Sequence, residues 1–409
     1  MMNTNKKTPK LRFKGFTDDW EQRQLGECMN SFAYGLNAAA KNYDGMHKYI
    51  RITDIDDETH NFIQSNLTSP DIDFNMDVSD YKLNVGDIVF ARTGASVGKT
   101  YLYNPNDGDL YYAGFLIRGK VKEDCDAGFI YQNTLTKEYD SFIRITSQRS
   151  GQPGVNSKEY ATFRLNIPCK DEQEKISKIL NCLDELFTLH QRKLEKLKLN
   201  KSALLQKLFP QNGCTIPEVR FKGFTDAWEQ RKFSDLYEKI SEKNDLSYSL
   251  DKIISVANMY YKSDAKVSNE EYLRTYNIFR YGEIAFEGNK SKEFTYGRFV
   301  ENTIGDGIIS HVFEVFRPIT KYDIYFWKYY INYEPIMGKV LSRCTKKTTM
   351  MTNLVAKDFL KETVFVPSLA EQKQIGILLN TLDKFITLHQ LNLDRLMSIK
   401  KGLLQQLFV

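Results

Sequence analysis

The chain has 409 residues, of which 42% are hydrophobic and 27% charged, so it is long enough to form two or three globular domains. No run approaches the roughly 18 apolar residues of a membrane helix, and no apolar stretch follows the basic N-terminus. Membrane and secreted classes are therefore excluded, and a cytoplasmic protein is expected. The six cysteines include no C-x-x-C pair, which argues against a zinc site or a disulfide framework.

The first element in the chain is a short segment that occurs twice. Residues 9–27 read PKLRFKGFTDDWEQRQLGE, residues 217–235 read PEVRFKGFTDAWEQRKFSD, and 12 of the 19 positions are identical. An internal repeat of this kind predicts that the chain is one structural unit used twice.

A body of roughly 130 to 150 residues follows each copy, and the two bodies differ in sequence. Residues 84–90 (NVGDIVF) and 280–286 (RYGEIAF) each resemble a turn that leads into a buried strand. Helical segments are expected near residues 129–145 and 322–341. Each body is therefore predicted to be a mixed α/β domain.

Polar loops in both bodies combine cations with amide and hydroxyl side chains. The longer loops are residues 147–158 (SQRSGQPGVNSK) and 343–353 (RCTKKTTMMTN), and shorter polar segments stand at 92–99 and 289–292. Lysine and arginine neutralise phosphates, whereas amides and hydroxyls can pair with base edges. The candidate DNA-contacting residues are Arg92, Thr93, Ser96, Lys99, Gln148, Arg149, Gln152, Asn156, Lys158, Asn289, Lys290, Lys292, Arg343, Lys346, Lys347, Thr348, Thr349 and Asn353.

The net charge of +5 does not by itself indicate a nucleic-acid partner, but the charges are segregated. Residues 52–81 contain eight acidic residues and no lysine or arginine, whereas residues 339–361 contain six lysines or arginines and one aspartate. This pattern favours one surface for an anionic partner and another that is kept away from it.

Long helices are predicted at the end of each half, at residues 171–209 and 371–408. Alternating steps of four and three residues place a line of apolar side chains on each helix, and a constant offset of 199 relates the two lines. Such a line is typical of a coiled-coil seam. The predicted seam residues are Leu180, Leu183, Phe187, His190, Leu194 and Leu197 in the first helix and Leu379, Leu382, Ile386, His389, Leu393 and Leu396 in the second.

The order of the parts predicts how these helices pair. The second body lies between the end of the first helix and the start of the second, so an antiparallel pair needs no long connection and relates the halves by a pseudo-two-fold axis. At 1.5 Å per residue, each helix is a rod of roughly 58 Å. Two dissimilar bodies at a fixed separation suit duplex DNA, in which equivalent grooves recur about every 34 Å.

Motifs of catalysis are absent or incomplete. Residues 94–100 (GASVGKT) have three residues between the glycines, whereas a phosphate-binding P-loop needs four. Residues 371–373 have the E-x-K spacing of metal nucleases, but glutamate replaces the lysine in the first copy, so a role in the first helical turn is favoured. No methyltransferase tetrapeptide or S-adenosylmethionine loop occurs. The chain is expected to be non-catalytic, with no cofactor and no metal.

The doubled RFKGFTD-x-W-EQR segment, the P-x-x-x-EQ-x-x-I entry to each long helix and the two divergent bodies resemble the specificity (S) subunit of type I restriction-modification systems. The resemblance covers the whole chain. It implies that each body is a target-recognition domain for one half of a bipartite, asymmetric sequence in double-stranded DNA. It also implies that the repeated segments bind two modification subunits, which methylate adenine, and that restriction subunits complete the nuclease.

The predicted fold is α+β, with two mixed α/β target-recognition domains joined by two long antiparallel coiled-coil helices. The expected boundaries are 1–170 (with the repeated segment 9–27), 171–210, 211–368 (with 217–235) and 369–409. The alternative hypothesis is a coiled-coil adaptor for other proteins, which predicts no salt-dependent affinity for DNA. A methyltransferase or nuclease in one chain would require a cofactor or metal motif.

Overall fold

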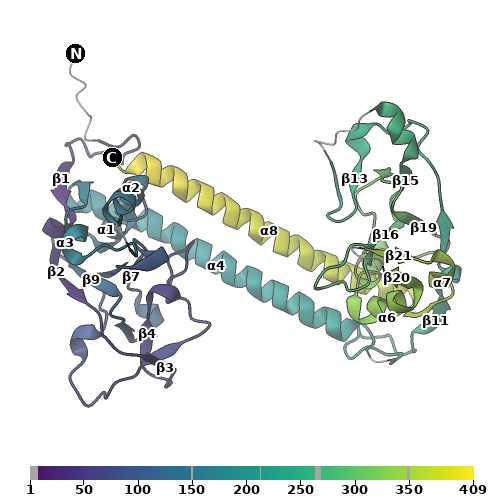
Figure 1. Ribbon diagram of the computed structural model, residues 1–409, viewed down its shortest axis with the longest axis horizontal. Helices are drawn as coiled ribbons and strands as arrows, with labels where there is room; N and C mark the ends of the chain where they lie inside the picture. Colours follow the sequence, from purple (N-terminus) through teal and green to yellow (C-terminus); the bar gives the residue numbers. More distant parts are fainter. Residues whose placement is uncertain (1–7, 149–150, 212, 263–268, 348–350) are drawn as a thin grey trace. The chain divides into compact units, whose positions relative to one another are not determined.

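The computed structural model describes residues 8–148, 151–211, 213–262, 269–347 and 351–409. The chain divides into two compact units, the first formed by Met1–Gln191 and Leu391–Val409 and the second by Arg192–Gln390 (Figure 1). Each unit contains one body and about half of each long helix. The architecture is mixed α+β, as the sequence predicted. No helix in the described part of the chain is apolar over a length that would cross a bilayer.

The first body is built on a four-stranded antiparallel sheet. Its strand order is β2 (Met29–Tyr34), β9 (Leu116–Val121), β6 (Asp87–Ala91) and β7 (Thr100–Leu102). All five residues of β6 are buried, in agreement with the buried strand predicted at this position. The remaining strands form the pairs β1 (Glu21–Gln24) with β10 (Arg164–Ile167), β3 (Ala40–Asn42) with β5 (Thr68–Pro70), and β4 (Lys48–Ile50) with β8 (Leu110–Tyr112).

The second body repeats this sheet order with different residues. Its four strands are β12 (Tyr237–Ile240), β19 (Glu314–Pro318), β16 (Ile284–Glu287) and β17 (Arg298–Glu301). The smaller pairs are β11 (Glu229–Lys232) with β22 (Thr363–Val366), β13 (Ile254–Ser255) with β14 (Tyr260–Tyr261), β15 (Asn277–Phe279) with β18 (Gly307–Ile309), and β20 (Thr345–Lys347) with β21 (Thr352–Leu354).

Short helices complete both bodies. They are α1 (Ala127–Asn133), α2 (Lys137–Thr146) and α3 (Ser157–Ala161) in the first body and α5 (Ile324–Tyr330), α6 (Glu334–Cys344) and α7 (Ala356–Phe359) in the second. Single 3-10 turns occur at Leu25–Cys28, Ile52–Asp54, Ser79–Tyr81, Gly94–Ser96, Pro105–Asp107, Phe233–Asp235, Leu250–Lys252 and Glu270–Thr275.

The helical segment expected in each body is interrupted. In the first body, the side chain of Thr136 caps the start of α2, and in the second, Pro335 stands in the first turn of α6; both features favour a new helix start. The polar loop expected at 343–353 also differs from the prediction. It contains the end of α6 and the hairpin strands β20 and β21, because Thr345, Lys346 and Lys347 pair in register with Leu354, Asn353 and Thr352.

The long helices are α4 (Lys170–Leu208) and α8 (Leu369–Leu407), within two residues of their expected bounds. In the first unit, Leu407 near the end of α8 belongs to the same core as Ile176 near the start of α4, and Asp184 of α4 pairs with Lys400 of α8 at 2.6 Å. In the second unit, Lys201 of α4 pairs with Asp383 of α8 at 2.5 Å. The two helices are therefore antiparallel within each unit. Every seam position that the sequence singled out is buried or half-buried.

The repeated segment joins each body to its long helix through a buried ion pair. The Arg12 guanidinium donates from Nε and Nη2 to the two carboxylate oxygens of Glu172, each at 2.8 Å, and Arg220 donates to Glu371 in the same way at 2.7 and 2.8 Å. The side chains of Glu172 and Glu371 are 0% and 1% exposed. These first-turn glutamates, expected to interact with the helix dipole, thus bind the arginine of the repeated segment. In both halves, the arginine of the repeated segment therefore binds the glutamate at the start of the long helix.

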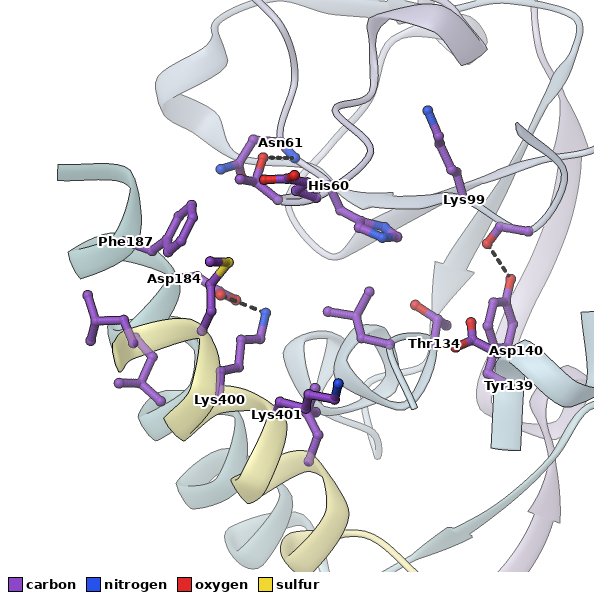
Figure 2. Close-up of a pocket in the computed structure, with 18 of the residues that line it drawn as sticks. His60, Asn61, Lys99, Thr134, Tyr139, Asp140, Asp184, Phe187, Lys400 and Lys401 are labelled. Atoms are coloured by element: carbon purple, nitrogen blue, oxygen red, sulfur yellow. Dashed lines mark hydrogen bonds and ion pairs between the residues drawn. The ribbon is translucent and has the colours of Figure 1, made fainter. Parts of the chain in front are cut away.

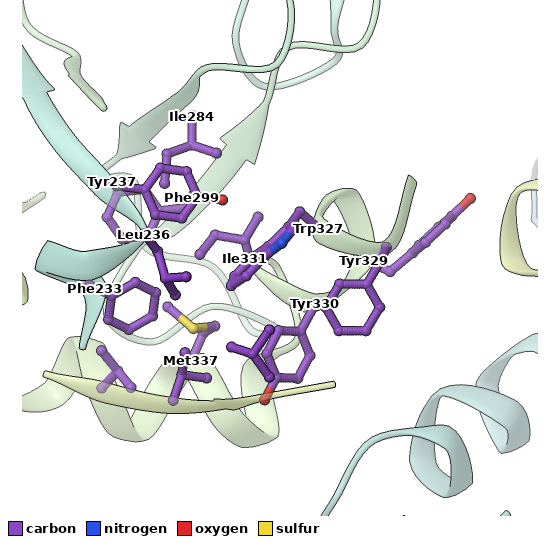
Figure 3. Packing of buried hydrophobic residues seen from close by; sticks show 14 of the residues in the cluster. Phe233, Leu236, Tyr237, Ile284, Phe299, Trp327, Tyr329, Tyr330, Ile331 and Met337 are labelled. Carbon is purple, nitrogen blue, oxygen red and sulfur yellow. The ribbon is translucent and has the colours of Figure 1, made fainter. Parts of the chain in front are cut away.

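The tryptophan of each repeated segment anchors the core. Trp20 packs edge-to-face on Phe129 of α1 with ring centroids 5.7 Å apart, and Trp228 packs on Phe326 of α5 at 5.9 Å. The second core continues through Trp327 of α5, which lies in one buried aromatic cluster with strand and helix residues (Figure 3). Full burial of a large apolar side chain contributes roughly 1.5–3 kcal/mol. The repeated segment therefore has a structural role in each body.

Candidate nucleic-acid interface

Two of the segments that the sequence predicted to contact DNA lie side by side in the first body. Residues 92–94 continue from the end of β6, and residues 152–155 belong to the loop between α2 and α3. The amide of Val155 donates to the carbonyl of Arg92 (2.9 Å), and the amide of Gly94 donates to the carbonyl of Pro153 (3.0 Å). We call this pair of segments the first polar ledge.

The second body brings its two polar segments together at the corresponding place. Residues 288–292 continue from the end of β16, the strand that occupies the position of β6 in the sheet order. The amide and the hydroxyl of Thr352 both donate to the carbonyl of Gly288, at 2.8 and 3.1 Å, and Asn289 bridges to Met351. Residues 288–292 and 351–353 form the second polar ledge. Bodies of different sequence thus place different polar side chains on equivalent backbone.

Most of the candidate side chains are open to solvent. Arg92, Thr93 and Ser96 are half-buried, and the exposed candidates are Gln148, Gln152, Lys158, Asn289, Lys290, Lys292, Arg343, Lys346 and Asn353. Arg149, Thr348 and Thr349 lie outside the described residues, and only the backbone of Lys347 is described, as part of β20.

Lys99, Asn156 and Arg343 are among the candidates that have protein partners. The ammonium of Lys99 pairs with Asp57 at 2.5 Å, and the Asn156 side chain accepts from the amide of Glu159 at 2.9 Å to cap α3. The Arg343 guanidinium binds both carboxylate oxygens of Glu362, with Nε at 3.0 and 2.9 Å, and this contact raises its pKa above the ordinary value. Contact with a phosphate would require the exchange of an existing ion pair or cap at each of these positions.

Known proteins resemble this chain in part of its sequence and in its fold. Residues 17–199 match the family described as "Type I restriction modification DNA specificity domain". The resemblance predicted from the sequence is confirmed.

Two curated proteins of Methanocaldococcus jannaschii are among the relatives. The protein assigned as the type I restriction enzyme MjaX specificity subunit is 24% identical over 196 residues, 47% of this chain and 46% of the relative. The type I restriction enzyme MjaVIII specificity subunit is 24% identical over 127 residues, 31% of this chain and 29% of the relative. Each match spans less than half of the relative.

The fold resembles a solved structure, the S subunit of a type I restriction-modification system from M. genitalium. The TM-score is 0.66 with 15% sequence identity, and the alignment covers 98% of this chain and 99% of the other. This likeness supports the mixed α+β fold with its long helices.

A cavity of about 630 Å³ lies beside Arg92 in the first body. The Arg92 guanidinium stands 4.9 Å from the centre of the Tyr34 ring, and Arg51 and the exposed Phe115 also line the cavity. Sequence reasoning identified Arg92 but missed Tyr34 and Phe115. Tyr34 ends a strand and Phe115 lies between two strands. The sequence around a single aromatic residue has no pattern that distinguishes an exposed ring from a core ring.

Lys99 belongs to a different cavity of the first unit, of about 460 Å³ (Figure 2). This cavity also includes His60, Asp140 and the ion pair between Asp184 and Lys400, so it lies where the first body meets its helices. Burial lowers the pKa of His60 below its ordinary value. The structure thus separates Arg92 and Lys99, which the sequence had grouped in one segment.

Proposed function

We propose that this chain is the DNA-specificity subunit of a type I restriction-modification complex. Residues 1–170 and 211–368 form two target-recognition domains, and each reads one half of a bipartite, asymmetric DNA sequence. Residues 171–210 and 369–409 form the antiparallel coiled coil that sets the spacing between the halves. The chain itself is non-catalytic and positions two adenine-methylating modification subunits, which the restriction subunits join.

The observation that supports this proposal best is the pair of polar ledges. Each lies at the end of the strand that stands third in its sheet order, β6 or β16, yet the first ledge carries Arg92 and Gln152 and the second carries Asn289 and Lys290. A conserved backbone that carries different polar side chains is what two readers of different base sequences require. An enzyme with two equivalent active sites would instead need the same reactive groups in both bodies.

The charge of the exposed candidates fits a duplex rather than a protein partner. Lys158 on the first body and Lys290, Lys292 and Lys346 on the second are exposed cations, alongside exposed amides at Gln148, Gln152 and Asn353. Cations of this kind displace counterions from the phosphates, and amides discriminate base edges. The curated relatives that match the chain are named as specificity subunits.

Genome-wide mapping of adenine methylation, with and without this gene, tests the proposal. Loss of one bipartite methylated motif on deletion, and its return on complementation, is the expected result. Purified chain should also bind duplex DNA with an affinity that falls steeply with salt. An unchanged methylation map together with no salt-dependent binding would favour the alternative, a coiled-coil adaptor for proteins.

A further inference from the structure

The same turn precedes the strand that stands second in each sheet order, β9 in the first body and β19 in the second. In the first body, residues 113–115 connect β8 to β9, and in the second, residues 310–313 connect β18 to β19. The register of the sheets makes these turns comparable. Phe90 of β6 pairs with Ile117, and its counterpart Phe286 of β16 pairs with Glu314. Two residues before those partners stand Phe115 and Val312.

Both of these side chains are apolar and exposed. Phe115 is 61% exposed and Val312 is 59% exposed, although most large apolar side chains near either sheet are buried. A single exposed apolar residue needs no explanation. Here two stand at equivalent positions in bodies with little sequence identity. Val85 and Tyr281, before β6 and β16, form another such pair, so exposure alone assigns no role.

The turns are held by backbone hydrogen bonds. In the first body, the amide of Leu116 donates to the carbonyl of Ala113 (2.8 Å), and the amide of Arg92 donates to the carbonyl of Phe115 (3.0 Å). Gly35 passes so close to this turn that a Cβ atom there would stand 2.2 Å from the Ala113 carbonyl oxygen. Phe115 is therefore presented on a fixed backbone.

The second turn is held in an equivalent way. The amide of Phe313 donates to the carbonyl of Ser310 (3.1 Å), and the side-chain amide of Asn277 donates to the carbonyl of Phe313 (2.9 Å). The backbone next to Val312, like that at Phe115, is thus fixed by hydrogen bonds. Rigid presentation of an exposed group lowers the entropy cost of binding a partner.

The surroundings of Phe115 favour a nucleic-acid partner. The bond between the Arg92 amide and the Phe115 carbonyl joins this turn directly to the first polar ledge. The described residues that line the adjoining cavity include no acidic residue. Arg92 has no carboxylate partner among the described residues, and its guanidinium lies over Tyr34. A cation and an apolar ring on one rigid edge match the mixture of polar groups and thymine methyl groups in the major groove.

We propose that Phe115 and Val312 are specificity-determining residues that contact thymine methyl groups, one in each half of the DNA target. This inference rests on the proposed function and goes one step further, since it assigns apolar readout to two positions that carry no polar group. Arg92 supplies the neighbouring polar contact in the first half-site.

Site selection from random duplexes tests the assignment with the full-length chain. Phe115→Ala should lose the preference for thymine at one base pair of the first half-site, and Val312→Ala should do so only in the second. The matched control is Val85→Ala, because Val85 is 78% exposed but stands before β6, at the opposite end of the strand from Arg92. It should select the wild-type site.

Removal of the methyl group from the DNA provides a test that does not depend on a variant. Each thymine of the selected site is replaced in turn by deoxyuridine, which lacks only the C5 methyl. One replacement in each half-site should weaken wild-type binding about fourfold, the factor that corresponds to about 0.8 kcal/mol for one buried methyl group. The same replacement in the first half-site should leave the affinity of Phe115→Ala unchanged.

The possible failures are distinguishable. A wild-type chain that selects no sequence would refute the proposed function itself. A wild-type chain that selects a bipartite site but is insensitive to every deoxyuridine replacement would overturn only this inference. Weaker binding of Phe115→Ala to all duplexes alike would also overturn it, because that result indicates a positioning contact rather than base readout.

Discussion

The ion pair between Arg12 and Glu172 offers a direct test of how the repeated segment supports the fold. Arg12→Ala removes both hydrogen bonds to a carboxylate whose side chain is 0% exposed. The charge of Glu172 would then remain buried without its partner. We therefore expect Arg12→Ala to destabilise the first unit strongly, although Arg12 belongs to neither polar ledge.

The size of the effect follows from the burial of the pair. Removal of one partner from a buried ion pair costs about 3–5 kcal/mol. The Arg12 side chain is 15% exposed, so water reaches the pair, and we expect the lower end of this range, about 3 kcal/mol. For a compact unit of roughly 200 residues, each kcal/mol shifts the Tm by about 2–4 °C, so a fall of about 6–12 °C is expected.

Thermal unfolding followed by circular dichroism measures this change, and hydrogen exchange localises it. Arg12→Ala should reduce amide protection in the β1 and β10 pair. Arg220→Ala, its matched counterpart, should reduce protection in the β11 and β22 pair instead. The double variant Arg12→Met with Glu172→Met should recover most of the lost stability, since an apolar pair of similar size leaves no buried charge.

Two outcomes would refute this reasoning. A loss below about 1 kcal/mol would mean that the pair behaves like a solvent-exposed salt bridge. Equal loss of protection in both units after Arg12→Ala would mean that the repeated segment does not act within its own unit.

Three further predictions concern the second body and the repeat. Glu301 is 3% exposed, both its carboxylate oxygens lack a hydrogen-bond partner among the described residues, and burial raises its pKa well above the ordinary value. Wild-type stability should therefore fall as pH rises above the ordinary glutamate pKa, because the unfolded chain releases this proton first. The stability of Glu301→Gln relative to the wild type should rise by at most about 1.4 kcal/mol per pH unit in thermal unfolding between pH 5 and 8. A stability difference that stays constant with pH would contradict this. Alanine at Lys346 and Lys347 should flatten the salt dependence of DNA binding, by about 0.9 in the logarithmic slope for each lost phosphate contact, and an unchanged slope would mean that neither lysine contacts phosphate. A fragment of residues 1–209 should form a symmetric antiparallel dimer, because only a second copy can cover its apolar seam, and the dimer should select a palindromic site. A monomeric mass in light scattering would argue against the two-unit architecture.

The sequence by itself determined the repeat, the two long helices and the mixed α+β character. These features are local or periodic, so they can be read without knowledge of distant contacts. The 3.5-residue spacing of apolar side chains predicted α4 and α8 to within two residues, because a helix repeats its environment at short range. The polar segments were also identified from composition.

Only the tertiary structure decided how these parts meet. Arg12 and Glu172 are 160 residues apart, and the sequence placed each of them in a repeated motif without indicating that the two bind each other. The hairpin of β20 and β21 likewise depends on the Gly288 carbonyl, 64 residues from Thr352. Hydrogen bonds between distant segments leave no periodic trace in the chain.

The exposure of Phe115 and Val312 was equally undetermined by the sequence. An apolar residue between two strands is expected to be buried, since transfer of its surface from water is favourable. In both turns the side chain is nevertheless left exposed. The sequence therefore identified which segments are polar, whereas the fold decided which side chains stand together, because exposure and charge pairing depend on groups that are far apart along the chain.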